Sequence, residues 1–180
     1  MYVGITGTLA SGKGEVVKIL KKKGFTHYSF GDFVRHLLAE RGAETTIPNI
    51  AALANQLRKE HGPGYIAELL LHKLEQEAPK HAVFESIRSL GELEVLRRLP
   101  GFILVSIDAP RETRWERYKQ RGRREGLTTF EEFSAAEDKQ LEGASYEQNL
   151  LAVMDKADVQ IVNIGSPEDL EAQLDETLNI

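Results

Sequence analysis

Apolar residues gather in five short runs, and stretches with helical spacing lie between them. The runs cover residues 2–6, 26–29, 81–86, 102–108 and 159–164. Those around Val83, Val105 and Ile161 are nearly continuous in apolar residues, which is typical of strands covered on both faces. Between the runs, apolar residues recur at i, i+3 and i+4, as from Val16 to Leu20. The alternation predicts an α/β fold of three α/β/α layers around a five-stranded parallel sheet with right-handed crossovers.

The length of 180 residues fits one domain. The core is expected at residues 1–31, 78–120 and 127–180. Residues 32–77 form a long helical insertion between the second and third strands, and part of it is expected to project as a mobile subdomain. Residues 121–126 contain two glycines between helical patterns and are expected to form a flexible flap.

Composition excludes several classes of protein. With 41% hydrophobic and 28% charged residues, the chain resembles an ordinary globular domain rather than a disordered or fibrous one. Cysteine is absent, which excludes disulfides, zinc-thiolate sites, cysteine nucleophiles and thiol redox chemistry. No run of about 18 apolar residues and no signal-peptide pattern is present, so we expect no membrane association and a cytoplasmic location.

The charge is unevenly distributed. The net charge of −5 disfavours nucleic acid as a partner, because phosphates must be neutralised by Lys and Arg. Residues 111–124 nevertheless carry six arginines and one lysine against two glutamates, a local charge of +5 on a remainder of −10. Such a density of arginine points to a local anionic ligand.

A phosphate-binding loop follows the first strand. The stretch G-T-L-A-S-G-K fits the pattern G-x-x-x-x-G-K and lies directly before a helix. Glycines let the backbone N–H groups turn inward around phosphate oxygens, the lysine adds a charge toward the outer phosphates, and the helix N-terminus adds its dipole. We expect ATP to bind here, on Gly7, Thr8, Leu9, Ala10, Ser11, Gly12, Lys13, Gly14 and Glu15.

The loop departs from the usual pattern at one position. Gly14 stands where a Ser or Thr hydroxyl normally ligates Mg²⁺. A magnesium ion must then be held by nucleotide oxygens, water and another side chain, for which Thr8, Ser11 and Glu85 are candidates.

The segment Y-S-F-G-D-F-V-R at residues 28–35 resembles the S-T-G-D-x-x-R segment of adenylate kinases and related nucleoside monophosphate kinases. In this P-loop kinase superfamily the arginine holds the acceptor phosphate, so the resemblance implies substrate-binding roles for Asp32 and Arg35. Phe30 replaces the family threonine. An arginine on a helix facing a phosphate loop also suits a second anion on physical grounds.

The segment V-F-E-S-I-R-S at residues 83–89 is similar to the D-G-F-P-R stretch of the same family. The similarity implies that Glu85 holds magnesium through water and that Arg88 contacts the acceptor phosphate. Independently of the family, a carboxylate at the end of a strand beside the phosphate loop offers hard oxygen to Mg²⁺.

The arginine-rich segment resembles the short lid of these kinases, in which arginines close over the transferring phosphates. The resemblance implies phosphate roles for Arg117, Arg121 and Arg123, with the lid at residues 121–126. We expect Arg111 and Lys119 instead to be solvated charges paired with Glu112 and Glu116. The segment also resembles small P-loop kinases related to adenylate or dephospho-coenzyme A kinases.

Together these motifs predict an enzyme that transfers the γ-phosphate of ATP to a nucleoside or deoxynucleoside monophosphate. The catalytic groups would be Lys13, Arg88, Arg117, Arg121 and Arg123. One alternative is transfer to a ribose hydroxyl, as in dephospho-coenzyme A kinases, with Asp32 as the base. Another is a nucleotide-binding regulator or ATPase without a small-molecule acceptor.

The sequence does not identify the base of the acceptor or the oligomeric state. Four polar residues lie near the place expected for the base, and the sequence does not rank them: Gln56, Arg58, Glu92 and Glu94.

Overall fold

The computed structural model describes residues 1–120, 127–141 and 149–180. The expected lid at residues 121–126, with Arg121 and Arg123, therefore lies outside the described residues. None of the helices in the described ranges is long and apolar enough to cross a membrane.

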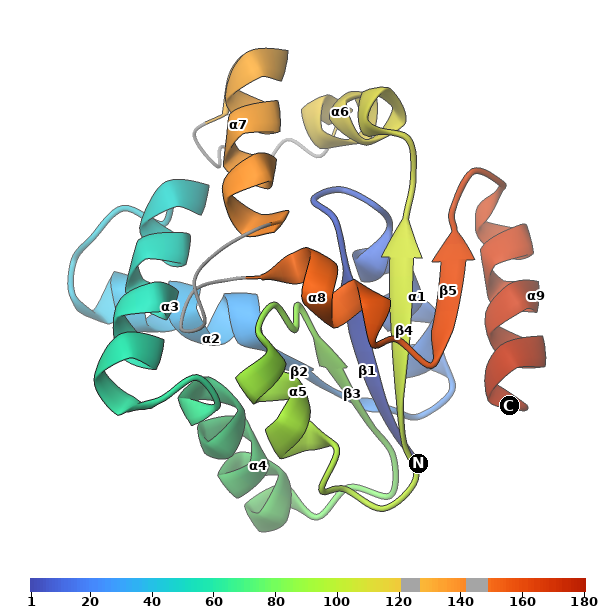
Figure 1. The fold of residues 1–180 in the computed structure, drawn as a ribbon. Coiled ribbons are helices and arrows are strands. Elements are labelled where there is room, and N and C mark those ends of the chain that lie inside the picture. Colours follow the sequence, from blue (N-terminus) through green and yellow to red (C-terminus); the bar gives the residue numbers. More distant parts are fainter. Residues whose placement is uncertain (121–126, 142–148) are drawn as a thin grey trace.

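A five-stranded, all-parallel sheet lies between two layers of helices, which confirms the predicted fold class (Figure 1). The strand order is β2-β3-β1-β4-β5. The strands are β1 (Tyr2–Gly7), β2 (Thr26–Ser29), β3 (Ala82–Glu85), β4 (Phe102–Asp108) and β5 (Val159–Val162). The helices are α1 (Lys13–Lys22), α2 (Phe30–Glu40), α3 (Ile47–His61), α4 (Tyr65–Glu77), α5 (Leu90–Leu96), α6 (Arg111–Gln120), α7 (Phe130–Leu141), α8 (Leu150–Asp155) and α9 (Pro167–Leu178).

The predicted strands agree closely with the observed ones, and the differences have local causes. Strand β3 ends at Glu85 because Ser86 adopts a positive φ of 72°, which extended backbone excludes. Strand β5 ends at Val162 because the chain turns there, with the Ile164 N–H donating to the carbonyl of Val162.

Each face of the sheet is buried under its own helices. One cluster joins α1 and α9 to β1 through residues such as Val16, Leu174 and Ile5. On the opposite face, α2, α3, α4, α5 and α8 pack on residues such as Phe84 and Leu104. The helices of the insertion therefore pack against β3 and α5 in the described structure. Strands that are apolar on both sides are the reason why the runs in the sequence do not alternate.

Helices α6 and α7 pack above the phosphate loop and are joined by a buried ion pair. The guanidinium of Arg114 contacts the carboxylate of Glu137, with 3.1 Å between Nη2 and Oε2, and both side chains are almost fully buried. Arg114 also donates to the carbonyls of Ala109 and Leu9. The pair therefore ties α7 to α6 and to the phosphate loop at once.

Removal of Glu137 should destabilise the fold strongly, because the buried Arg114 guanidinium loses its contacting carboxylate and keeps only Asp108, 3.6 Å away, while Arg111 loses a partner as well. We expect Glu137→Ala to lower the free energy of unfolding by about 3–5 kcal/mol in urea titrations. Glu116→Ala, which removes an exposed ion pair with Lys119 on the same helix as Arg114, should cost about 1 kcal/mol or less. Equal losses in the two variants would contradict this role for the buried pair.

Candidate functional site

The site lies at the carboxyl ends of the five parallel strands. Strand β1 leads into the phosphate loop, and the other four strands end at or next to Ser29, Glu85, Asp108 and Asn163. The chain leaves β1 toward β2 on one side of the sheet, whereas it leaves the neighbouring strand β4 toward β5 on the other side, so the edge between β1 and β4 is a topological switch point. Ligands of open α/β sheets bind at such points.

The phosphate loop has the backbone that its glycines predict. Gly7 and Gly12 adopt φ values of +138° and +113°. A Cβ at Gly7 would lie 1.9 Å from the carbonyl oxygen of Ile107, and one at Gly12 would lie 2.1 Å from Nδ2 of Asn163. A side chain at Gly7 would require movement of the β4 backbone, and one at Gly12 would displace the Asn163 amide; both φ values also disfavour any residue with a Cβ.

Lys13 sits over this loop. Its Nζ donates to the carbonyls of Gly7 and Thr8, at 2.9 and 2.6 Å, and the residue is only 6% exposed. The loop also contains a buried hydroxyl, Oγ of Ser11, which has no hydrogen-bond partner within the described structure. A buried polar group of this kind suits a ligand that brings its own acceptor oxygens, as a phosphate does.

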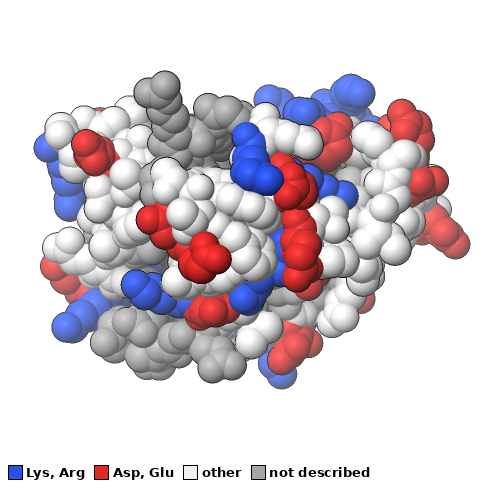
Figure 2. Space-filling model, turned by 90° about the horizontal axis from the view of Figure 1, so that it is seen from above, with Lys and Arg blue, Asp and Glu red and all other residues white. Residues whose placement is uncertain are grey.

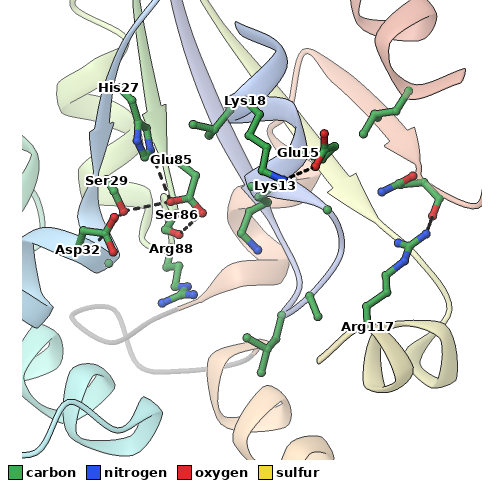
Figure 3. Close-up of a pocket in the computed structure, with 18 of the residues that line it drawn as sticks. Lys13, Glu15, Lys18, His27, Ser29, Asp32, Glu85, Ser86, Arg88 and Arg117 are labelled. Carbon is green, nitrogen blue, oxygen red and sulfur yellow. Dashed lines mark hydrogen bonds and ion pairs between the residues drawn. The ribbon is translucent and has the colours of Figure 1, made fainter. Parts of the chain in front are cut away.

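One continuous cavity of about 750 Å³ runs past this loop. Toward β4 and β5 it is lined by Arg117, Asn163 and Gly165, and toward β2 and β3 by Asp32, Arg35 and Arg88. Figure 3 shows Asp32, Glu85 and Arg88 on one side of Lys13 and Arg117 on the other. The loop thus lies between two compartments of the same cavity.

Glu85 is the most strongly perturbed acid in the cavity. Its carboxylate accepts hydrogen bonds from Ser29 Oγ at 3.0 Å and Ser86 Oγ at 2.7 Å, and Nε2 of His27 lies 3.8 Å away. Burial raises the pKa of this carboxyl group, but His27, the charge of Lys13, Ser86 and the charge of Arg88 together outweigh burial and lower the pKa to about 2. Glu85 is therefore a fixed anion beside the phosphate loop.

The two arginines expected on the acceptor side line the cavity. Arg35 forms an ion pair with Asp32 one turn earlier on α2. Arg88 lies in the loop after β3, where Oε2 of Glu92 accepts its N–H at 2.9 Å and its carbonyl accepts from the Asn149 N–H at 2.8 Å. The structure thus brings Asp32, Arg35 and Arg88 to one end of the cavity.

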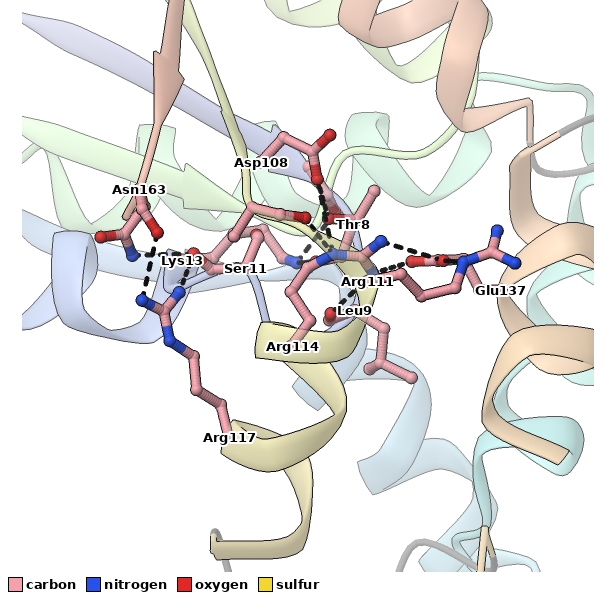
Figure 4. Close-up of polar contacts among 12 residues, drawn as sticks. Thr8, Leu9, Ser11, Lys13, Asp108, Arg111, Arg114, Arg117, Glu137 and Asn163 are labelled. Atoms are coloured by element: carbon pink, nitrogen blue, oxygen red, sulfur yellow. Dashed lines mark hydrogen bonds and ion pairs between the residues drawn. The ribbon is translucent and has the colours of Figure 1, made fainter. Parts of the chain in front are cut away.

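The described arginines of the basic segment do not form a single group. Arg117 donates to the carbonyls of Ser11, at 3.4 Å, and Asn163, at 3.1 Å, so it covers the phosphate loop from the β5 side (Figure 4). Lys119 pairs with Glu116 as expected. For Arg111 the expected partners were wrong: its ion pairs are with Glu137 and Asp138 on α7.

Two of the unranked polar residues are buried and face each other. Arg58 and Glu92 form an ion pair of 2.7 Å whose side chains are 2% and 0% exposed, and neither lines the large cavity. The sequence named both among the unranked candidates near the acceptor base, and their burial against each other leaves neither of them free to contact a base in the large cavity. The carboxylate three residues after Ser89 is a sequence signal for the capping box at the start of α5, and not for its pairing with Arg58.

The side chains of the cavity could hold magnesium only together with oxygens from a bound nucleotide or water. Within the described ranges, no three acidic or histidine side chains gather in a way that could hold a metal ion on their own. Glu85 offers one ionised carboxylate in the cavity, while the hydroxyl of Thr8 donates to Asp108. Hard carboxylate oxygen together with phosphate oxygens and water is a typical magnesium environment.

Comparison with known proteins gives the family. A family model described as an AAA domain matches residues 3–140. A UPF0200 protein of Thermococcus kodakarensis is 34% identical over 179 residues, which cover 97% of this chain and 94% of the relative. The chain belongs to the UPF0200 family.

Solved structures similar to this UPF0200 chain extend over its whole length. TT1252 from Thermus thermophilus has a TM-score of 0.64 and 26% identity, and covers 99% of this chain and 96% of its own. Shikimate kinase from Aquifex aeolicus has a TM-score of 0.54 and 19% identity, with the same coverage, and is similar in fold alone. The UPF0200 chain therefore has the fold of the small P-loop kinases, which agrees with the superfamily that the sequence predicted.

Several residues of the site carry no local sequence signal in this UPF0200 chain. Asn163 follows β5, and its side-chain amide donates to the carbonyl of Ser11 at 2.8 Å. Asp108 ends β4 and accepts from the hydroxyl of Thr8. Position at the end of a buried strand is the one feature that could have singled them out.

Glu85 makes the stability of the fold depend on pH. Its pKa is lower in the folded protein than the ordinary value of 4.5, so its contribution is complete above pH 4.5 and disappears as the pH falls toward 2. Without divalent cations, the stability difference between wild type and Glu85→Gln should shrink by about 2 kcal/mol between about pH 6 and about pH 3. Urea titrations at each pH measure it, and a difference that stays constant with pH would contradict the low pKa.

Proposed function

We propose that this protein is an ATP-dependent phosphotransferase whose acceptor is a nucleoside or deoxynucleoside monophosphate. The observation that carries the proposal is the single cavity in which the phosphate loop lies between Arg117 and the pair Arg35 and Arg88. Arginines on both sides of a phosphate loop suit two substrates that each carry phosphate and meet over that loop.

The donor would bind on the β4–β5 side. Residues 7–15 would surround its phosphates with backbone N–H groups, and Lys13 would exchange the carbonyls that it now contacts for phosphate oxygens. Arg117 is held against Ser11 and so lies within reach of the same nucleotide. Arg121 and Arg123 are proposed to close over the phosphates from the segment between α6 and α7.

Magnesium would be held by nucleotide oxygens and by Glu85 through water, with no ligand from Gly14. When bound, the ion neutralises charge on the phosphates of the donor. Glu85 suits this task because its pKa of about 2 keeps it ionised throughout the physiological range.

The acceptor would bind between α2 and the loop after β3, within the proposed acceptor-binding insertion of residues 32–77. Arg35 and Arg88 would hold its phosphate so that one oxygen points at the γ-phosphorus of ATP. That oxygen forms the new bond while the bond to the bridging oxygen of ADP breaks, and the products are ADP and a nucleoside diphosphate. The attacking oxygen carries no proton that must be removed, so the protein supplies position and positive charge.

A second candidate is transfer to a hydroxyl group, and the exposure of Asp32 favours it. The Asp32 side chain is 62% exposed and lines the cavity at the start of α2. A hydroxyl nucleophile must lose a proton, and Asp32 would be the base that accepts it. Asp32→Asn should then lower the rate by about 10²- to 10⁴-fold. With a monophosphate acceptor the same variant should change mainly the KM for the acceptor, because Asp32 then takes no proton and acts only in binding through its pair with Arg35.

The acceptor is identified by a panel of nucleoside and deoxynucleoside monophosphates and dephospho-coenzyme A, each with ATP and magnesium and with products separated by chromatography. Lys13→Met serves as the control for contaminating kinases. Phosphorylation of at least one monophosphate is expected. Transfer to dephospho-coenzyme A alone would select the second candidate, and ATP hydrolysis without transfer to any compound would contradict both.

Arg35→Ala should weaken the acceptor and leave the donor unchanged. Loss of a charge-assisted contact to phosphate costs about 1.5–3 kcal/mol, so the KM for the monophosphate should rise about 10- to 150-fold. The KM for ATP should stay within about twofold, because Arg35 lies in the acceptor compartment. Arg41→Ala, which removes an exposed arginine at the end of the same helix, is the matched control. Equal KM values for the acceptor in the two variants would exclude Arg35 from the site.

A further inference from the structure

The loop that carries Arg88 is held at successive peptide groups. The carbonyl of Ile87 accepts from the hydroxyl of Thr6 at 2.8 Å. The N–H of Arg88 and that of Ser89 both donate to Oε2 of Glu92, at 2.9 and 3.2 Å. A loop fixed in this way gives its side chains a defined starting point, which a group that binds substrate requires.

Glu92 is the centre of this arrangement. While one carboxylate oxygen accepts the two N–H groups, the other accepts Nε and Nη2 of Arg58, at 3.0 and 2.7 Å. Arg58 is itself oriented by Oδ1 of Asn55, which accepts Nη1 at 3.0 Å. A carboxylate with both oxygens doubly occupied has one orientation, so α3 fixes the side chain that fixes the loop.

Close packing also holds the turn between α3 and α4 against the start of α5, next to the Arg58–Glu92 pair. A Cβ on Gly91 would lie 2.5 Å from Cβ of Pro63, and one on Gly64 would lie 2.6 Å from Val95. The hydroxyl of Ser89 also donates to the carbonyl of Pro63 at 3.1 Å. The turn between α3 and α4 therefore sits directly on the first turn of α5.

Stability alone does not account for charges at this position. A buried ion pair loses much of its attraction to the cost of desolvation, and apolar residues of similar volume often serve a fold equally well. An apolar pair could not, however, accept the N–H groups of Arg88 and Ser89. The feature that only the charged pair supplies is the link from α3 to the backbone of Arg88.

We propose that the Arg58–Glu92 pair is a positioning device for the acceptor site. The pair connects α3 to the backbone of the loop after β3 and thereby holds Arg88 where its guanidinium can bind the acceptor phosphate. Arg58 and Glu92 are positioning residues, since neither lines the cavity. The inference rests on the proposed function, because it assigns the phosphate that Arg88 holds to the acceptor.

The experiment compares Arg58→Met, Arg58→Lys and Glu92→Gln with the wild type. Arg58→Met removes both contacts to Glu92. In Glu92→Gln the amide has a single acceptor oxygen, so its NH₂ group must face either the Arg58 guanidinium or the N–H groups of Arg88 and Ser89, and those contacts are lost. Arg58→Lys keeps the buried charge but not the two-pronged contact, so it retains a folded protein if the other variants unfold. Melting temperature and circular dichroism establish that each variant is folded.

In folded variants the KM for the acceptor should rise about tenfold or more, as for loss of a charge-assisted contact, while the KM for ATP stays within about twofold. Arg58→Lys should show a smaller rise in the same direction. The matched control is Arg98→Met, which breaks the exposed Arg98–Glu68 ion pair between the end of α5 and α4. Its KM values should equal those of the wild type.

An unchanged acceptor KM in a folded Arg58 or Glu92 variant would overturn the proposal, and so would an equal rise in the KM for ATP. A wild type that phosphorylates none of the compounds in the panel would contradict the proposed function instead. The positioning role is then measured by calorimetry, as the affinity for inorganic phosphate of protein saturated with a non-hydrolysable ATP analogue. That affinity should fall about tenfold in the variants, and equal affinity in variant and wild type would overturn the proposal.

Discussion

The contact of the phosphate loop with the ends of β4 and β5 is the constraint on which the site depends. Gly7 approaches the backbone of Ile107 so closely that a methyl group would overlap it, and Gly12 approaches the side-chain amide of Asn163. Thr8 and Ser11 are bonded to Asp108 and Asn163 across the same boundary. A loop whose N–H groups must converge on an anion needs such support, because its own backbone lacks the regular hydrogen bonds of a helix or strand.

Two buried ion pairs attach helices to this fixed edge, one in each half of the site. Arg114 and Glu137 connect α6 and α7 to the carbonyl of Leu9, and Arg58 and Glu92 connect α3 to the loop of Arg88. Both arginines also bond groups other than their carboxylate partner. The cost of desolvation offsets much of the attraction in a buried ion pair. Unlike apolar packing, however, the hydrogen bonds of such a pair fix the relative positions of the groups that it joins. Each pair adjoins a part of the chain that lines the cavity: the phosphate loop in one half and Arg88 in the other.

The sequence predicted the fold and the strand ends well, because both depend on local pattern. Strands covered on both faces have continuous apolar runs, and the phosphate loop has glycines where positive φ values occur. Pairing between distant charges was not predictable in the same way. Arg114 and Glu137 are 23 positions apart, and Arg58 and Glu92 are 34 apart, so no local spacing marks either pair. The sequence showed which residues are charged, whereas the fold decides which of them are neutralised internally.

This distinction changes the meaning of the basic segment at residues 111–124. Its excess of positive charge suggested one group of arginines around a phosphate, yet Arg111 and Arg114 are paired with acids on α7 and Lys119 with a neighbour on α6. Seen from above, the basic and acidic side chains of the described residues lie intermixed on this face of the molecule (Figure 2). Among the described residues, the cations that line the cavity come from several elements, and only Arg117 of them belongs to the basic segment; the others are Lys13, Lys18, Arg35 and Arg88. A protein with a net negative charge can bind the phosphates of a nucleotide because binding depends on a few cations that converge on one site, and not on the total charge.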